Sequence, residues 1–96
     1  MPMKNPAHPG RSIKDELEEH GLTTAEAAAG LGVTRQQLHN VMTGKSSITP
    51  DMALRLECGI GGTADHYLRM QASYDLAQAR LRGDKLNIKK FAPRAA

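Results

Sequence analysis

Residues 33–45 have the sequence VTRQQLHNVMTGK and carry the complete signals of one short helix. Thr34 suits the N-cap position, and Gln37, three residues later, can reach back to complete a capping box. Gly44 suits the left-handed residue that commonly closes a helix. Apolar residues recur at the i, i+3, i+4 spacing of a buried stripe, namely Leu38, Val41 and Met42. The stretch therefore predicts a helix with one buried face and one exposed face.

The exposed face of this helix carries long polar side chains and no acidic residue. Side chains of this kind can hydrogen-bond to base edges in the major groove of DNA. The helix N-terminus adds free backbone N–H groups and a positive dipole end, which favour phosphate. A merely solvated face is the alternative interpretation, but solvated helices usually carry Glu and Lys in quantity. We interpret the stretch as a DNA recognition helix, whose outward residues are Arg35, Gln36, His39, Asn40 and Thr43.

A second short helix is predicted just before the recognition helix. Thr23 suits its N-cap, and Glu26 supplies another capping box. Its buried residues would be Ala27, Ala28 and Leu31. Gly32 then allows a tight turn into the recognition helix. Two short helices joined by about three residues with a glycine are typical of the helix-turn-helix motif.

Two further helices have clear start and stop signals. The first is predicted to begin at Pro9, because proline is favoured at the first helical position, and to end at Gly21. The other follows Ile48-Thr49-Pro50, which combines a staple residue, an N-cap and a proline at the first helical position. Glycine costs roughly 1 kcal/mol per helical position relative to alanine. We therefore expect this helix to stop near residues 59–61, within a glycine-rich segment.

The fifth and longest helix should run from its N-cap Thr63 to about Leu81 and carries two apolar stripes. One stripe contains Tyr67, Met70, Tyr74, Ala77 and Leu81, and the other contains Leu68, Ala72, Leu76 and Ala79. A domain of this size can use one stripe for its own core, so the second favours a partner surface, although the domain could also wrap the helix itself. We expect a homodimer, with an interface of Tyr67, Leu68, Met70, Gln71 and Tyr74.

Charge is distributed unevenly along the 96 residues, whose formal net charge of +3 permits nucleic-acid binding without requiring it. Six of the 13 Lys and Arg residues fall in the last seventeen positions, with Asp84 as their only acidic neighbour. Residues 1–8 contain two prolines and no apolar periodicity. We therefore expect a flexible N-terminal arm (1–8), a helical domain (9–82) and a basic tail (83–96).

The remaining composition disfavours an enzyme and a membrane protein. The single cysteine, Cys58, allows no intrachain disulfide, and we expect it to be buried on its helix. The histidines have spacings that match no zinc motif, and no nucleophile, acid–base pair or phosphate loop has a partner at a recognisable spacing. Without a leader peptide or a long apolar run, the chain is expected to be cytoplasmic. We expect no catalytic residue, cofactor, metal site or membrane contact.

Four segments together resemble a known family: His8-Pro9-Gly10, the helix-turn-helix of residues 22–44, the run ITPDMALRL of residues 48–56, and Gln71 followed by Tyr74-Asp75-Leu76. They are similar to HigA-type antitoxins, which belong to the Cro/repressor-like helix-turn-helix class. The resemblance covers roughly residues 8–82, and the last two segments are more specific than the helix-turn-helix alone. It implies a lambda-repressor-like five-helix bundle that dimerises, binds an RNA-cleaving toxin and represses a shared operon through operator double-stranded DNA.

The resemblance also assigns roles on the DNA-binding face. Base-reading positions are Arg35, Gln36 and Asn40, with His39 beside them. Phosphate-contacting positions are Thr24, Thr34, Gln37, Thr43 and Lys45. The basic tail does not suit a basic toxin, so toxin contacts are expected from the arm, the first helix or the fifth helix. A stand-alone transcriptional regulator without a toxin is the main alternative, followed by a protein adaptor that has lost DNA binding.

Overall fold

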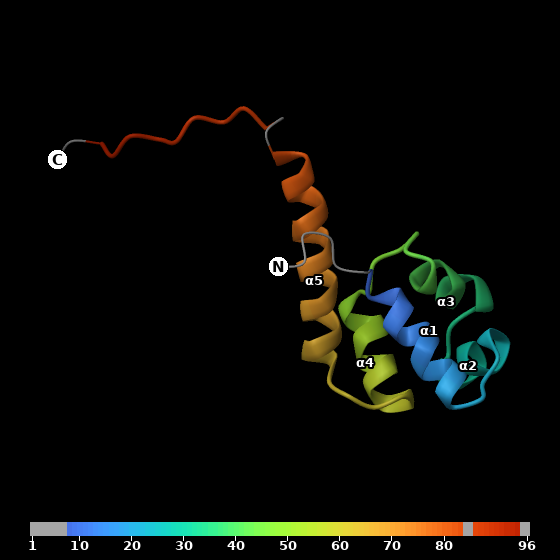
Figure 1. The fold of residues 1–96 in the computed structure, drawn as a ribbon. Coiled ribbons are helices and arrows are strands. Elements are labelled where there is room, and N and C mark those ends of the chain that lie inside the picture. The colour runs from blue at the N-terminus through green and yellow to red at the C-terminus, as the bar shows by residue number, and fades with distance from the viewer. Residues whose placement is uncertain (1–7, 84–85, 95–96) are drawn as a thin grey trace.

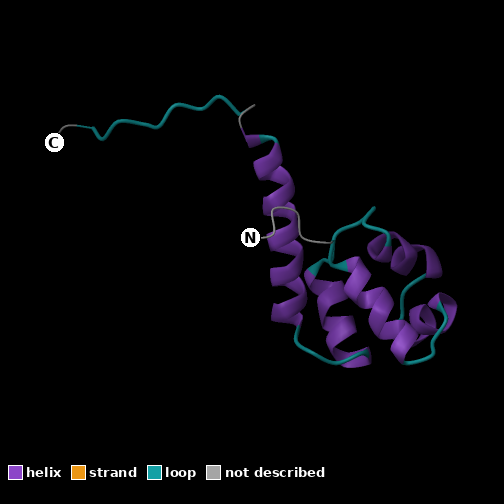
Figure 2. Cartoon of the chain, in the orientation of Figure 1, coloured by secondary structure: helices purple, strands orange, loops and turns teal. Residues whose placement is uncertain are grey.

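The structure is a computed structural model that describes residues 8–83 and 86–94. These residues form five α-helices joined by loops and turns, which confirms the predicted all-α fold (Figure 1, Figure 2). The helices are α1 (Gly10–Glu19), α2 (Thr24–Leu31), α3 (Arg35–Met42), α4 (Pro50–Gly59) and α5 (Ala64–Leu81). Within the described part of the chain, none of them has the length and apolarity needed to cross a membrane.

Four of the five helices begin at a threonine cap. In each, the threonine side chain accepts a hydrogen bond from a backbone N–H of the first turn, and the caps are Thr23, Thr34, Thr49 and Thr63. Such a cap typically contributes about 0.5–2 kcal/mol relative to alanine. The predicted end of α4 near Gly59 is confirmed, whereas α1 begins at Gly10, one residue later than predicted, with Pro9 as its N-cap.

The core lies where α1 packs on α3, α2 packs on α3 and α4, and α4 packs on α5. Its most completely buried large side chains are Ile13, Leu38 and Leu56, which come from three different helices. Leu38 and Val41 are buried and Met42 is half-buried, so the predicted inner face of α3 is confirmed. This packing holds α3 at the edge of the domain with its polar face outward.

The first turn of α1 touches the last turn of α3 through backbone atoms. A Cβ atom added at Gly10 would overlap the carbonyl oxygen of Val41 and would lie 2.7 Å from the carbonyl oxygen of Met42. Both atoms belong to the backbone, which cannot rotate away as a side chain can. Glycine is therefore required at position 10 by close approach, and α1 helps to fix the end of α3.

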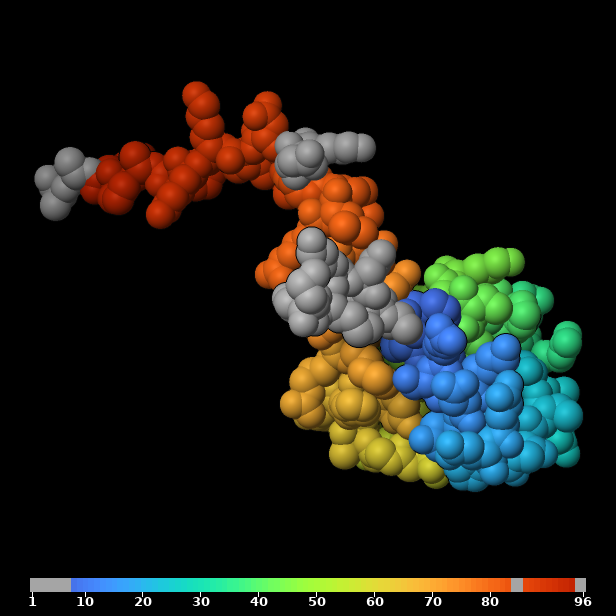
Figure 3. Space-filling view, viewed as in Figure 1, coloured from blue at the N-terminus to red at the C-terminus, as the bar shows by residue number. Residues whose placement is uncertain are grey.

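The two ends of the described chain differ in how they relate to the domain. His8, predicted to belong to the arm, packs its ring edge-on against Tyr74, with ring centroids 6.0 Å apart, and the arm residues 1–7 lie outside the described residues. The C-terminal half of α5 projects beyond the other helices, and the segment 86–94 is exposed and runs away from them (Figure 3). The expectation that Cys58 is buried is wrong. Cys58 is exposed, because its position on α4 faces away from the core.

Candidate nucleic-acid interface

The recognition helix α3 starts with the predicted capping box. The Thr34 side-chain oxygen accepts the Gln37 backbone N–H at 3.0 Å, and the Gln37 Oε1 accepts the Thr34 backbone N–H at 2.8 Å. Gln37 therefore has a structural role at the helix start. A hydroxyl that accepts one hydrogen bond still has its O–H to donate, so Thr34 keeps a donor for an incoming phosphate. Arg35, the first residue of α3, follows this cap and is exposed.

Two of the predicted base-reading residues are bonded to each other. The Gln36 Nε2 donates to the Asn40 Oδ1 at 2.8 Å, one helical turn away. A pair of this kind stabilises a helix by only about 0.2–0.5 kcal/mol. A bidentate contact from Gln or Asn to adenine is worth about 1–3 kcal/mol of discrimination. DNA can therefore displace the internal bond at small cost, and until then the bond holds both amides on the outer face.

The end of α3 is closed by Gly44, which adopts the predicted left-handed conformation with φ at +85°. The Lys45 and Ser46 backbone N–H groups both donate to the Asn40 carbonyl, at 2.9 and 3.0 Å. The Thr43 hydroxyl donates to the His39 carbonyl at 2.9 Å. This hydroxyl must release that bond before it can donate to a phosphate. Lys45 is exposed beyond the turn.

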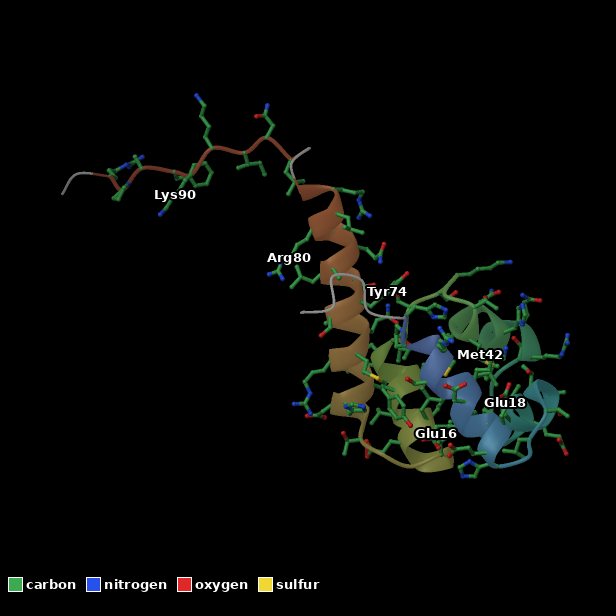
Figure 4. The ribbon with its side chains drawn as sticks, viewed as in Figure 1. Glu16, Glu18, Met42, Tyr74, Arg80 and Lys90 are labelled. Carbon is green, nitrogen blue, oxygen red and sulfur yellow. The ribbon has the colours of Figure 1, made fainter. Side chains whose placement is uncertain are left out.

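A hollow of about 610 Å³ joins the outer face of α3 to α1 and α2. Its lining includes three of the predicted DNA-contacting residues, Thr24, His39 and Thr43, together with two cations of α1, Arg11 and Lys14. These cations were not among the predicted site residues, because the sequence does not show that α1 runs beside α3. Asp15, Glu18 and Met42 also line the hollow, and Figure 4 shows Glu18 and Met42 on the facing helices α1 and α3.

The turn between α2 and α3 is fixed from outside by Arg55 of α4. Its Nη1 donates to the carbonyl of Leu31 at 2.8 Å and to that of Gly32 at 3.3 Å. Its Nε donates to Asp51 at 2.7 Å, one turn earlier on α4. A planar guanidinium suits this role because it offers several donors in a fixed geometry. Sequence reasoning missed this contact, since it joins residues more than twenty positions apart.

The predicted dimer residues of α5 divide into inward and partly exposed groups. Tyr67 and Gln71 are buried in the chain itself, contrary to the expectation that they face a partner. The Tyr67 hydroxyl donates to the Gly61 carbonyl at 2.9 Å, and burial, with the nearby charge of Glu16, raises the pKa of this hydroxyl. Leu68, Met70 and Tyr74 are half-buried.

The second stripe of α5 stays largely exposed, although its first residue, Leu68, packs against the core. Its other members are Ala72, Leu76 and Ala79. Figure 4 shows Tyr74 on the side of α5 nearest the other helices and Arg80 on the opposite side. An apolar surface thus continues along a helix that projects from the domain.

Comparisons with known proteins agree with this arrangement. Residues 13–66 match the Helix-turn-helix family model. Virulence-associated protein A' of Dichelobacter nodosus is 42% identical over 77 residues, which cover 79% of this chain and 67% of that protein. Antitoxin HigA-1 of Vibrio cholerae serotype O1 is 31% identical over 80 residues, covering 82% of this chain and 75% of the relative.

Among solved structures, antitoxin GraA has a TM-score of 0.84 at 30% identity, covering 91% of this chain and 98% of its own. GraA in complex with its operator has a TM-score of 0.81 at 29% identity, covering 93% of this chain and 94% of its own. The similarity therefore includes α5 as well as the helix-turn-helix.

Proposed function

Because this chain belongs to the Helix-turn-helix family, we propose that it is a cytoplasmic antitoxin that represses its own operon as a DNA-bound dimer and neutralises an RNA-cleaving toxin. The observation that carries the proposal is the similarity to antitoxin GraA over 91% of the chain, together with the polar, acid-free outer face of α3. GraA has also been solved in complex with its operator, which supports a DNA-binding role for the shared fold.

In the proposed complex, α3 lies in the major groove and its residues divide into readers and positioners. Arg35 is in the first turn, where its fork matches guanine O6 and N7. Gln36 and Asn40 each suit adenine, with His39 beside them. Lys45 contacts phosphate, as does a second set of donors, namely Arg11, Lys14, Thr24, Thr34, Gln37 and Thr43. The Thr43 hydroxyl first gives up its hydrogen bond to the His39 carbonyl. The base-reading residues determine which DNA sequence is preferred, and the phosphate-contacting residues fix the register of the protein on the DNA.

The proposed homodimer uses the projecting part of α5 and places two recognition helices about 34 Å apart, one turn of DNA. The wild-type protein should sediment at twice its chain mass of 10.4 kDa at micromolar concentration. Leu76→Asp should shift it towards monomer, because Leu76 lies on the exposed stripe and is 49% exposed in the single chain.

Leu54→Asp is the matched control for the dimer, because Leu54 is 56% exposed and lines a hollow between α2 and α4 with Gly30 and Arg55. This variant should remain dimeric. A wild-type chain that sediments as a monomer both alone and on DNA would contradict the dimer.

The proposed toxin surface is the side of α1 that carries the exposed Glu16 and Glu19, because Asp15 and Glu18 line the hollow beside α3 together with Arg11 and Lys14. A protein that binds RNA needs a basic surface, and such a surface is complementary to this helix. The remainder of the predicted toxin surface is the arm and α5. Residues 1–7 of the arm lie outside the described residues.

Co-expression tests the toxin half of the proposal. The open reading frame beside this gene should arrest growth when expressed alone. Expression of this chain should restore growth and yield a stable complex with the neighbouring product. A neighbour that is harmless alone would contradict the antitoxin role and leave the stand-alone regulator as the better description.

A further inference from the structure

Gln71 is a polar side chain on α5 that is only 9% exposed, and it bonds to the segment that joins α3 to α4. Its Oε1 accepts the backbone N–H of Ile48 at 2.8 Å, in a buried hydrogen bond between residues 23 positions apart. Its Nε2 donates to the Asp75 Oδ1 at 2.9 Å. An ionised carboxylate only accepts hydrogen bonds. Asp75 therefore holds the NH₂ group and leaves the amide oxygen turned towards Ile48.

The next turn of α5 meets the end of α3 through His8. The His8 ring lies edge-on to Tyr74, with an angle of 74° between the rings. The same ring comes within 3.4 Å of the position that a Cβ on Gly44 would take. A small internal space is lined by Gln71, Tyr74, His8, Gly44 and residues of the α1–α3 contact. The middle of α5 is thus joined to both ends of the α3–α4 connection.

These contacts differ in kind from the packing of α5 on α4. Apolar burial is non-directional, so it does not by itself select one orientation of α5 on α4. A hydrogen bond weakens steeply when its angle is lost. The Gln71–Ile48 bond is therefore a directional contact between α5 and the α3–α4 connection, at the residue just before the Thr49 cap of α4.

We infer that Gln71 is a positioning residue that fixes the angle between α5 and α3, and so sets the half-site spacing that the dimer accepts on DNA. The inference rests on the proposed function, in which α5 joins the two protomers and α3 enters the groove. Rotation of α5 relative to α3 changes the distance between the two recognition helices. A rigid junction restricts the dimer to one spacing, and a loosened junction admits neighbouring spacings.

Selection of binding sites from a library of random duplexes measures this spacing directly. Wild type should enrich two inverted half-sites at one separation. Gln71→Met keeps a similar volume but removes the acceptor for Ile48, and should enrich the same half-site sequence at several separations. In titrations, its preference for the wild-type spacing over a spacing one base pair longer should fall by about tenfold. Ser73→Met, at an exposed position of the same helix that lies outside the second stripe, is the control and should keep the wild-type preference.

A merely structural role for Gln71 would lower stability without changing the spacing preference. A folded, dimeric Gln71→Met protein with the wild-type preference would therefore overturn the inference. If this variant does not fold, Asp75→Leu takes its place, since it removes only the group that orients the Gln71 amide, and it should relax the spacing in the same direction. An Asp75→Leu dimer that keeps the wild-type preference would then overturn the inference. A wild-type chain that enriches no sequence would overturn the proposed function, and this inference with it.

Discussion

Replacing Gly10 by alanine should lower the free energy of unfolding by about 3 kcal/mol or more, at or above the upper end of what overpacking usually costs. The added methyl group would meet the Val41 and Met42 carbonyl oxygens, which are backbone atoms of the last turn of α3. Relief requires α1 and α3 to separate, and that opens the core around Ile13 and Leu38. For a domain of this size, the loss corresponds to a Tm lower by roughly 12–24 °C.

Gly30→Ala is the matched control for this substitution. Gly30 lies inside α2, and a Cβ there would meet nothing within 4 Å. Alanine should stabilise this helix by about 0.5–1 kcal/mol, because it loses less backbone freedom than glycine on folding. Thermal unfolding followed by circular dichroism compares the two variants with wild type. A Gly10→Ala protein with the Tm of wild type would show that α1 and α3 do not make this close contact.

Arg35→Ala should weaken operator binding by about 1–3 kcal/mol and relax the preference at one base pair of each half-site. The lost bidentate contact between Arg35 and guanine depends on the base sequence, so binding to scrambled DNA should change little. Lys45→Ala is the comparison, because it removes a proposed phosphate contact from the far end of α3. It should weaken binding to all DNA sequences about equally. It should also lower the slope of log affinity against log salt concentration by roughly one unit per site.

Titrations on operator and scrambled duplexes, each at two salt concentrations, separate these two effects. If Arg35→Ala weakens both duplexes alike, Arg35 binds phosphate and the reading face lies elsewhere on α3.

The helices of this fold could be predicted from the sequence because their signals are local. Thr34 and Gln37 lie within one turn of each other, and so do the cap and the first turn of each later helix. The exposed face of α3 follows from the same periodicity, because Leu38 and Val41 must point inward once the helix forms. These features require no knowledge of how the helices pack.

The contacts between distant helices could not be predicted in this way. The sequence shows two apolar stripes on α5 but not which one meets α4. The prediction that Tyr67 and Gln71 face a partner therefore differs from the structure, in which both are buried in the chain. The same limit applies to Arg55, which bonds to Leu31 across the fold. Gly10 has no sequence signal either, because its need for glycine comes from the backbone of α3.

Methylation interference on the selected operator tests most directly whether α3 reads bases through Arg35. Methylation at guanine N7 blocks one of the two acceptors that the Arg35 fork should use in the major groove. Wild type should lose binding when one particular guanine in each half-site is methylated. Arg35→Ala, which has already lost that contact, should be indifferent to the same methyl group while it stays sensitive to the others. An unchanged interference pattern in Arg35→Ala would contradict the reading of operator DNA by Arg35 on α3.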